Sequence, residues 1–535
     1  MSFDLVTNHL LTWMILVPAI VSLALLATEG FGGVPAVAWR VVGLAASLVE
    51  LALGGLLFAN FDPRRTGFQL VDYAPWLPEY GIHYYVGVDG IGLPLVLLTS
   101  LLVPVAMVAS WNQIARAPRA FVFFLLVLES SMVGAFASLN LFQFYVYAEV
   151  MLVPMYFLVG VWGQTRRREA ALRFLVFSML GSALLLVSSL ALAYLGFDQN
   201  GVWSFDLVPS PWGETPGLLD VVVATTGPWW QTQFWLFGAF ALAFAIRIPL
   251  VPFHVASVAA QVEAPPAASV LLAGVLTKVG AYGLLRYALP LFPTAAAEWT
   301  PFLLTLCVVG VLYAALLALV QRDLKRLVAY ASLAQLGFVV LGVLSMNLQG
   351  MNGSVMQMVN HGLSTAALFV LVGMLEERRG TRDLLELGGV ARPMPIFACL
   401  LVVAALSLIG TPPLNGFVGD FLVLLGVYRV SPVHAVWASV GVVCAGLTML
   451  WMLRSVLLGP IEHGENRKLI DLDWREKTAV LALCIPIVAI GVYPSPLLRR
   501  IEPSVSDLLQ QIETRRSIVD DASAARPETD LEDLR

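Results

Sequence analysis

The chain has 535 residues, of which 59% are hydrophobic and only 13% charged, with a mean hydropathy of +0.82 and a formal net charge of −5. Soluble proteins carry about 25% charged residues, so this composition excludes an ordinary soluble domain, and nothing in the charge balance points to a nucleic-acid partner. Apolar runs of 18 or more residues recur throughout, which places the chain in a lipid bilayer.

Windows of about 20 apolar residues predict fourteen transmembrane helices, and therefore an all-α polytopic membrane protein. The first apolar run lacks a basic leading region and a small-residue cleavage site, so we expect a retained span rather than a signal peptide. The fourteen spans are 9–27, 36–58, 88–112, 119–138, 141–163, 170–196, 232–256, 265–290, 300–320, 326–346, 354–375, 395–426, 433–459 and 477–498.

Basic residues gather in the loops after spans three, five, nine, eleven and thirteen. These loops have the same parity, so the positive-inside rule predicts that all five face the cytoplasm and that both termini face away from it, in a bacterial inner membrane. The residues concerned are Arg116, Arg119, Arg166 to Arg168, Arg322, Lys325, Arg326, Arg378, Arg379, Arg382, Arg392, Arg467, Lys468, Arg475 and Lys477.

Two segments outside the spans have distinct compositions. The loop 59–87 carries Arg64 and Arg65 on the opposite side and is rich in aromatic residues ("WLPEYGIHYY"), which predicts an ordered external cap. The segment 501–535 has nine acidic and four basic residues, which predicts an exposed, weakly structured tail.

Two spans are interrupted by proline and glycine: "AFAIRIPLVPFHVASVAAQVEAPPAAS" (243–269) and "LSLIGTPPLNGFVGDFLVLL" (406–425). Such breaks free backbone groups, which bilayer depth tolerates only where protein or a watery cavity receives them. A pair of broken helices, the seventh and the twelfth, in corresponding halves indicates inverted repeats. We predict five regions: 1–118 (helices 1–3 and the external loop), 119–290 (first repeat), 300–459 (second repeat), 460–500 (cytoplasmic loop and helix 14) and 501–535 (tail).

Five ionisable residues lie too far inside spans to reach the surface: Glu149, Arg247, Lys278, His361 and Asp420. A charge at mid-span costs about 2.5–3.5 kcal/mol on an insertion scale, so the four fixed charges cost on the order of 10 kcal/mol together. They are either ion pairs that orient helices or members of a polar, hydrated path. Their spread over five spans that flank both breaks favours the path.

The chemistry of each group predicts its part in such a path. A guanidinium keeps its charge in proteins, whereas a buried lysine can give up its proton. Arg247 is therefore predicted to be a fixed charge that holds Glu149 ionised, and Lys278 a proton carrier. His254 either caps carbonyl groups freed at Pro252 or relays protons, and both interpretations stay open.

Two further features have simpler interpretations. Glu263, in "VEAP", is predicted to lie at the amino end of span eight, where a carboxylate complements the helix dipole. The four cysteines are scattered singly and are predicted to be packing residues: Cys307, Cys399, Cys444 and Cys484. The sequence has no glycine-rich nucleotide loop, iron–sulfur cysteine set or flavin fingerprint, so any redox chemistry is expected in partner chains, with no cofactor or metal here.

Several blocks in order resemble a known family: "VGVDGIGLPLVLLT", "YAEVMLVPMYFLVGVWG", "VEAPPAASVLLAGVLTKVGAYGLLR", "QMVNHGLSTAALFVLVGMLEERRGTRD" and "NGFVGDFLVLLG". They are similar to subunit M of respiratory NADH-quinone oxidoreductase (complex I), an antiporter-like family of the membrane arm. The resemblance implies fourteen helices with two inverted five-helix repeats, and a proton channel driven by quinone reduction elsewhere. It also implies NAD, FMN, iron–sulfur clusters and quinone in partner subunits, and neighbouring antiporter-like subunits as partners.

The resemblance also implies residue roles. Glu149 matches the glutamate of the fifth helix, Lys278 the lysine of the eighth and His361 a histidine of the eleventh. Asp420 takes the place of an acidic residue, usually glutamate, on the twelfth helix.

The departures from the family pattern concern groups that exchange protons. Arg247 stands where the family has lysine, and Gln261 and Gln335 stand where histidines are expected. Glutamine can still orient water in a hydrated chain. The main prediction is a proton-translocating subunit. The alternatives are a weakly pumping or purely structural paralogue, and a subunit of a multi-subunit cation/proton antiporter; the "VGVDGIGLPLVLLT" and "EERRGTRD" blocks favour complex I over the antiporter.

Overall fold

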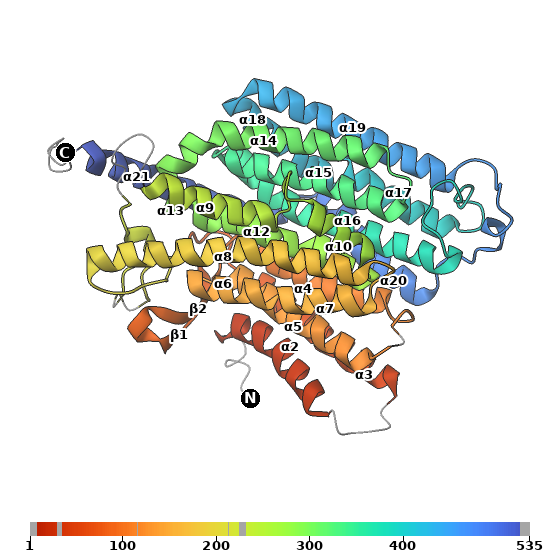
Figure 1. Cartoon of the computed structure of the whole chain (residues 1–535), viewed down its shortest axis with the longest axis horizontal. Helices are drawn as coiled ribbons and strands as arrows, with labels where there is room; N and C mark the ends of the chain where they lie inside the picture. Colours follow the sequence, from red (N-terminus) through yellow and green to blue (C-terminus); the bar gives the residue numbers. More distant parts are fainter. Residues whose placement is uncertain are drawn as a thin grey trace.

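Each of the fourteen predicted spans coincides with a helix or with consecutive helices in the computed structural model, which describes residues 8–28, 35–114, 116–211, 213, 215–223 and 232–524. The helices lie roughly side by side in an elongated bundle (Figure 1). The first six spans are α2 (Leu10–Ala27), α3 (Ala36–Asn60), α4 (Gly92–Ala109), α5 (Pro118–Ala137), the pair α6 (Leu141–Val150) and α7 (Leu152–Trp162), and α8 (Arg167–Asn200).

The remaining spans contain both breaks. They are α9 (Thr232–Arg247) with α10 (Val255–Glu263); the continuous run α11 (Pro266–Leu271), η4 (Leu272–Leu276), α12 (Thr277–Gly283), η5 (Leu284–Ala288) and α13 (Leu289–Leu291); α14 (Pro293–Leu319); α15 (Leu324–Leu344); α16 (Leu348–Arg379); α17 (Pro395–Leu408) with α18 (Asn415–Val430); α19 (Pro432–Leu457); and α20 (Trp474–Val492). Among the described residues, eleven helices are long and apolar enough to cross a membrane, or up to twelve with one bent pair. The count of fourteen crossings therefore stays a prediction.

Both predicted interruptions are present. The first separates α9 from α10 over 248–254, which contains Pro249 and Pro252, and the second separates α17 from α18 over 409–414. Gly410 in the second break has φ +70°, and a Cβ there would lie 2.4 Å from Oδ2 of Asp420. Only glycine tolerates both the left-handed backbone and this close approach, so the break is built directly against the Asp420 carboxyl.

The five basic loops lie at one end of the bundle, the right-hand end of Figure 1. Polar contacts join them: Gln113 to Glu377 (2.8 Å), Gln164 to Glu376 (2.5 Å), Arg475 to Asn112 (2.9 Å), Arg382 to Asp323 (3.2 Å) and Arg378 to Glu476 (2.5 Å). The shared end agrees with the common parity of the loops. The compartment that it faces stays a prediction.

The predicted external cap is an ordered β-hairpin at the opposite end, made of β1 (Gln69–Leu77) and β2 (Ile82–Val88). His83 anchors it, because its Nδ1 lies 2.7 Å from Oδ2 of Asp206, and both side chains are buried. Asn140 donates to the other oxygen of Asp206 at 2.8 Å. A histidine that the sequence gives no role therefore fixes the hairpin to the helices.

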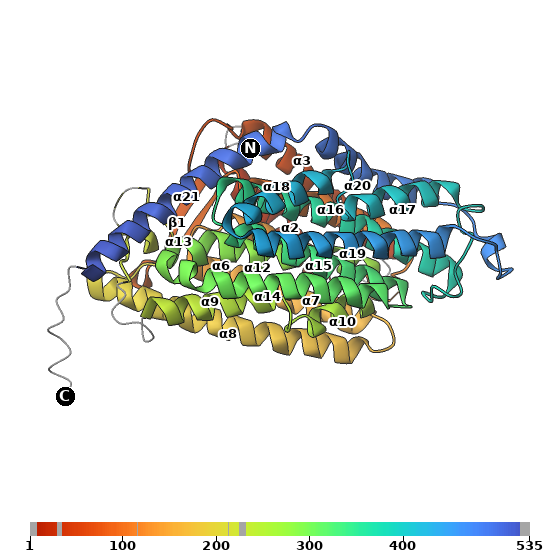
Figure 2. The ribbon, with the colours of Figure 1, turned by 90° about the horizontal axis from the view of Figure 1, so that it is seen from above.

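The prediction of a weakly structured tail from residue 501 is wrong for the described part. Residues Ser495–Ala524 form helix α21, which packs along α14 and α16 and runs along the outside of the bundle (Figure 2). Its buried residues include Ile501, Val505 and Leu508, which recur at helical spacing. The high overall content of charged residues in this segment obscured the apolar stripe in the sequence. Residues 525–535 lie outside the described part of the chain.

The docking of α21 predicts unequal costs for two isoleucines on that helix. Ile501 is 0% exposed and Ile518 is 47% exposed. Ile501→Ala should lower the free energy of unfolding by about 2–5 kcal/mol, whereas Ile518→Ala should change it by less than about 0.5 kcal/mol. Thermal unfolding in detergent, followed by labelling of the buried thiols Cys307 and Cys484, measures both. Equal effects would mean that α21 is not docked in solution.

Candidate functional site

The first break places Arg247, the last residue of α9, against two other helices. Its Nη2 lies 2.6 Å from Oε1 of Glu149 on α6 and donates to the Ser182 hydroxyl on α8 at 2.8 Å. Its Nη1 donates to the Ala148 carbonyl at 3.0 Å. The Arg247 side chain is 7% exposed and that of Glu149 27%. The predicted partnership between these two charges is thus a direct, largely buried ion pair.

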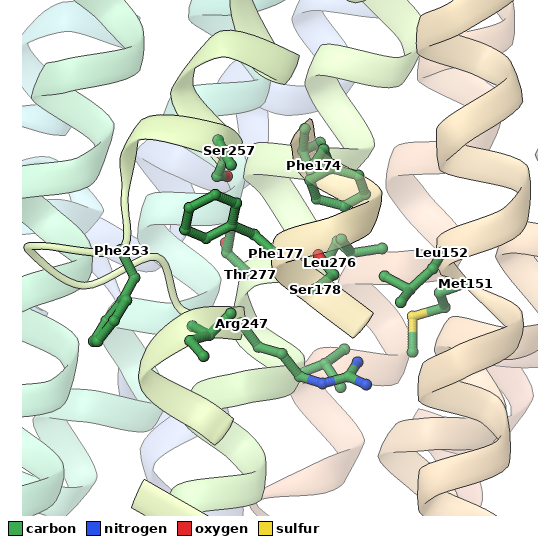
Figure 3. Close-up of a pocket in the computed structure, with 14 residues that line it drawn as sticks. Met151, Leu152, Phe174, Phe177, Ser178, Arg247, Phe253, Ser257, Leu276 and Thr277 are labelled. Carbon is green, nitrogen blue, oxygen red and sulfur yellow. The ribbon is translucent and has the colours of Figure 1, made fainter. Parts of the chain in front are cut away.

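A cavity adjoins this ion pair and reaches toward the eighth span. Arg247 lies on one side of it and Thr277, the residue before Lys278, on another (Figure 3). Phe253 and Ser257 contribute from the break and from α10. Its full lining is Met151, Leu152, Phe174, Phe177, Ser178, Ile246, Arg247, Phe253, Ala256, Ser257, Leu272, Leu276, Thr277 and Val279. A cavity partly lined by hydroxyl groups therefore lies between the Arg247–Glu149 ion pair and the segment that carries Lys278.

Lys278 lies two residues after the end of η4, a single π-helical turn over Leu272–Leu276. Such turns are frequent at functional positions. The lysine is fully buried, donates to the Ala273 carbonyl in that turn, and lies 2.7 Å from Nδ1 of His361 on α16. No salt bridge joins it to a carboxylate in the described residues. A buried amine without a counter-ion is costly to keep charged, so this site favours release of the proton.

His361 links Lys278 to the next helix. Its Nε2 lies 2.9 Å from the hydroxyl of Ser332 on α15. A lysine, an imidazole and a hydroxyl on three different spans therefore form one continuous hydrogen-bonded chain. The sequence did not single out Ser332, although it lies one turn before Gln335 on the same helix.

Gln335, one turn beyond Ser332 on α15, contacts the second break. Gln335 donates to the Leu408 carbonyl, at the end of α17, at 2.8 Å, and accepts from the Gln357 amide at 3.2 Å. Asp420 on α18 is 4% exposed and interacts electrostatically with Gln335. Neither of its carboxyl oxygens has a hydrogen-bond partner of ordinary geometry in the described chain. The break thus offers a buried carboxyl group with unused acceptor capacity.

Beside this chain lies a second polar cluster that the sequence indicated only through "HGLSTAALF". Ser407 donates to Oδ1 of Asn415 at 2.5 Å, and its hydroxyl also contacts that of Ser364. Asn360 donates to the Asn415 carbonyl at 2.8 Å. All four residues are buried. Their signal in the sequence is weak, because serine and asparagine in spans usually make helix–helix hydrogen bonds.

Other predicted residues lie outside this chain. The His254 ring packs on Tyr313 and Tyr330, with centroids 5.5 and 6.2 Å away, and no hydrogen bond among the described residues joins it to Lys278. The Gln261 side chain donates a hydrogen bond to the Ser257 hydroxyl at 3.3 Å, its one side-chain hydrogen bond among the described residues. The structure therefore does not bring these two positions together with Lys278 and His361.

Two residues near the basic loops differ from expectation. Glu263 ends α10 and accepts from the backbone N–H of Arg166, the N-cap of α8, at 2.9 Å. It complements the dipole of α8, not that of the eighth span, because the chain turns back toward α8 at this end of the bundle. Lys325, predicted to lie in a loop, is 1% exposed and donates to the Ala264 carbonyl at 2.5 Å, between α10 and α11.

The chain is similar to known proteins over most of its length. Residues 138–448 match the family model described as "NADH:quinone oxidoreductase/Mrp antiporter, TM", and residues 68–135 match "NADH-ubiquinone oxidoreductase chain 4, amino terminus". NADH-quinone oxidoreductase subunit M of Rhodobacter capsulatus is 37% identical over 475 residues, which cover 88% of this chain and 90% of the relative. The chain belongs to the NADH-quinone oxidoreductase subunit M family.

Solved structures place the family's fold in two kinds of complex. A chain of respiratory complex I from Thermus thermophilus has a TM-score of 0.82 and 28% identity, with 94% of this chain and 99% of that chain covered. A chain of the Mrp complex from Dietzia sp. has a TM-score of 0.76, 20% identity and coverage of 95% and 99%. The second likeness shows the fold alone, so the sequence relatives decide the family.

The Arg247–Glu149 pair predicts a stability difference between two arginines. Arg247→Gln leaves a largely buried carboxylate without its partner, and should lower the free energy of unfolding by about 1–3 kcal/mol, less than for a fully buried pair because Glu149 is partly exposed. Arg173→Gln is the matched control, since its pair with Glu169 is more than half exposed on both sides and should contribute less than about 0.5 kcal/mol. Thermal unfolding of both variants checks this; a loss no larger for Arg247→Gln contradicts it.

Proposed function

We propose that protons cross this subunit along Glu149, Lys278, His361 and Asp420, as part of a membrane-arm subunit that couples quinone reduction elsewhere in NADH-quinone oxidoreductase to proton translocation. The observation that carries the proposal is the contact Lys278–His361–Ser332, which joins three spans between the two broken helices. The proton-translocating function is inferred from the family, and the route is inferred from these contacts.

The Lys278–His361 contact is the central transfer step. Two nitrogen bases 2.7 Å apart in a dry site share one proton, because two adjacent cations there would repel each other strongly. The proton held by Lys278 passes to Nδ1 of His361, and Nε2 passes a proton on toward Ser332. The donation from Lys278 to Ala273 keeps the amine aimed along this line.

Each broken helix supplies one end of the route. At the first break Arg247 is paired with Glu149, so a proton that reaches Glu149 must displace an ion pair before it enters the cavity beside Thr277. At the second break the Asp420 carboxyl, whose oxygens have no hydrogen-bond partner of ordinary geometry among the described residues, receives the proton. Gln335 and Gln357 do not titrate, and act by orienting water between Ser332 and Asp420.

We infer the setting of the subunit from its family and from the placement of its basic loops. The redox chemistry, with NAD, FMN, iron–sulfur clusters and quinone, belongs to partner subunits, and this chain is a non-redox part of the translocase. Adjacent antiporter-like subunits and the lipid bilayer are its partners, in a bacterial inner membrane with both termini on the non-cytoplasmic side. The regions 119–290 and 300–459 act as the two repeats, each with one broken helix.

The second candidate is a weakly pumping paralogue, and three departures favour it: Arg247, Gln261 and Gln335. Gln335 is held to the Leu408 carbonyl, and Gln261 lies apart from the Lys278 chain. If water does not fill these positions, the route is interrupted on both sides. A cation/proton antiporter subunit has less support, since the likeness to the Mrp complex is one of fold.

The route predicts that Lys278→Met abolishes translocation through this subunit. Loss of a positioned acid–base group slows proton transfer by about 100-fold or more, so protons moved per electron should fall by the full share of this subunit. Lys468→Met, in the exposed loop, is the matched control and should leave the ratio unchanged. The whole complex in vesicles, driven by NADH and quinone, gives both values. A normal ratio in Lys278→Met would remove the route proposed here.

The two candidate functions differ in their response to changes at Gln335. If the glutamine orients water, Gln335→Leu should reduce the proton-to-electron ratio by the same share as Lys278→Met, and Gln335→His should preserve it, because the imidazole restores an exchanging group. If the subunit pumps weakly, Gln335→Leu leaves the ratio at the wild-type value and Gln335→His raises it. The same vesicle assay separates these outcomes.

A further inference from the structure

Two carboxyl groups outside the proposed route lie buried in the N-terminal helices. Glu50 on α3 and Glu129 on α5 are both 0% exposed. None of their four carboxyl oxygens has a hydrogen-bond partner in the described residues. A buried polar group without a partner costs free energy that folding must offset, so two such groups on adjacent helices call for an explanation.

The helix register brings the two side chains together. A Cβ on Gly43 of α3 would lie 2.4 Å from Cγ1 of Val122 on α5, so the helices touch at this level. They run in the same direction, because α4 lies between them in the chain and packs antiparallel on α3, with Ser47 beside Met107. Glu50 and Glu129 each lie seven residues, or two turns, beyond that contact. The two carboxyl groups interact electrostatically.

Among the described residues, no cation is paired with these carboxyl groups. Helices α2, α4 and α7 contain no charged residue. On α3, Arg40 donates to the Ile114 carbonyl, and on α5, Arg119 lies in the first turn, more than two turns from Glu129. Other elements packed on α5 carry groups that are already engaged: Glu149 with Arg247, His83 with Asp206, Lys278 with His361.

The charge state follows from this isolation. Two carboxylates ionised close together in a buried site, with no paired cation among the described residues, would each pay desolvation and would repel each other. At least one of the pair therefore carries a proton at neutral pH.

A cavity connects the neighbourhood of the pair to the end of the bundle that holds the basic loops. It lies between α3, α4 and α5 and is lined by Arg40, Met107, Ser110, Trp111, Ile114, Pro118, Phe121, Val122 and Leu125. Leu125, its deepest residue on α5, is one turn before Glu129, about 6 Å along the helix axis. Water that enters at Arg40 and Pro118 thus comes within one helical turn of the carboxyl pair.

We propose that Glu50 and Glu129 form a proton-holding carboxyl pair, loaded from the basic-loop end of the bundle through this cavity and separate from the route through the broken helices. One or both of the carboxyl groups hold a proton, according to the load. The ligand of this site is a proton, which water delivers. It does not depend on the Lys278–His361 contact.

Infrared spectroscopy of the whole complex in vesicles tests the pair. The wild type should show the carbonyl stretch of a protonated, buried carboxyl at neutral pH, and transfer to D₂O should shift it. The double variant Glu50→Gln, Glu129→Gln, which keeps shape and polarity, should lose this band, whereas Glu79→Gln on the exposed end of the hairpin should keep it. A spectrum of the double variant identical to that of the wild type overturns the pair.

A second variant tests the access route and guards against misfolding of the first. Leu125→Trp fills the cavity and keeps both glutamates in the sequence, and should slow the D₂O shift of the band by about tenfold or more, the effect of adding about 1.4 kcal/mol to the opening barrier. An unchanged exchange rate in Leu125→Trp overturns loading through this cavity.

Lys278→Met separates this proposal from the proposed route. It should leave the carboxyl band and its exchange unchanged while the proton-to-electron ratio falls. A band that disappears in Lys278→Met shows that the carboxyl pair is not independent, and so overturns the separation stated here.

Discussion

The structure depends on one constraint: a charge or a freed backbone group at bilayer depth must find its partner inside the protein, because lipid offers none. Both broken helices meet this constraint through contacts with neighbouring helices. The carbonyl of Leu408, at the end of α17, is taken by Gln335, and that of Ala148 by Arg247. Lys278 takes the carbonyl of Ala273 in the π-turn beside it. Polar side chains thus hydrogen-bond the carbonyl groups of the irregular backbone. Each is tolerated at bilayer depth because the other is its partner.

The same constraint separates fixed charges from exchangeable protons. Arg247 has three acceptors within reach and a carboxylate among them, so its charge is neutralised where it stands. Among the described residues, Lys278 has a carbonyl and an imidazole but no carboxylate, and the Asp420 carboxyl oxygens have no hydrogen-bond partner of ordinary geometry. The groups that are incompletely satisfied are the ones able to change protonation. The proposed route therefore runs through the groups that lack a counter-ion or a full set of hydrogen bonds.

Hydrogen bonds and ion pairs also hold the helices together at the two ends of the bundle. At the hairpin end, His83 and Asn140 both hold Asp206, and α21 adds the contact between Ser504 and the backbone of Gly90 at 2.8 Å. At the opposite end, ion pairs and amide bridges join the basic loops. The long helices between them are thereby held in register, which keeps Lys278, His361 and Ser332 within hydrogen-bond distance although they belong to three spans.

Local chemistry made much of this molecule readable from the sequence: the spans, from runs of apolar residues; the two breaks, from proline and glycine; and the mid-span groups Glu149, Arg247, Lys278, His361 and Asp420, from the cost of burying charge. Only the tertiary structure decided their partners. A span that is apolar on every side does not show which face meets its neighbours, so Ser332, Gln357, and the pairing of Glu50 with Glu129 could not be read from residue type or spacing. The docking of α21 was hidden for the opposite reason, because abundant surface charge masked one buried stripe. Partner choice depends on which faces the packing brings together, and that information is spread over helices far apart in the chain.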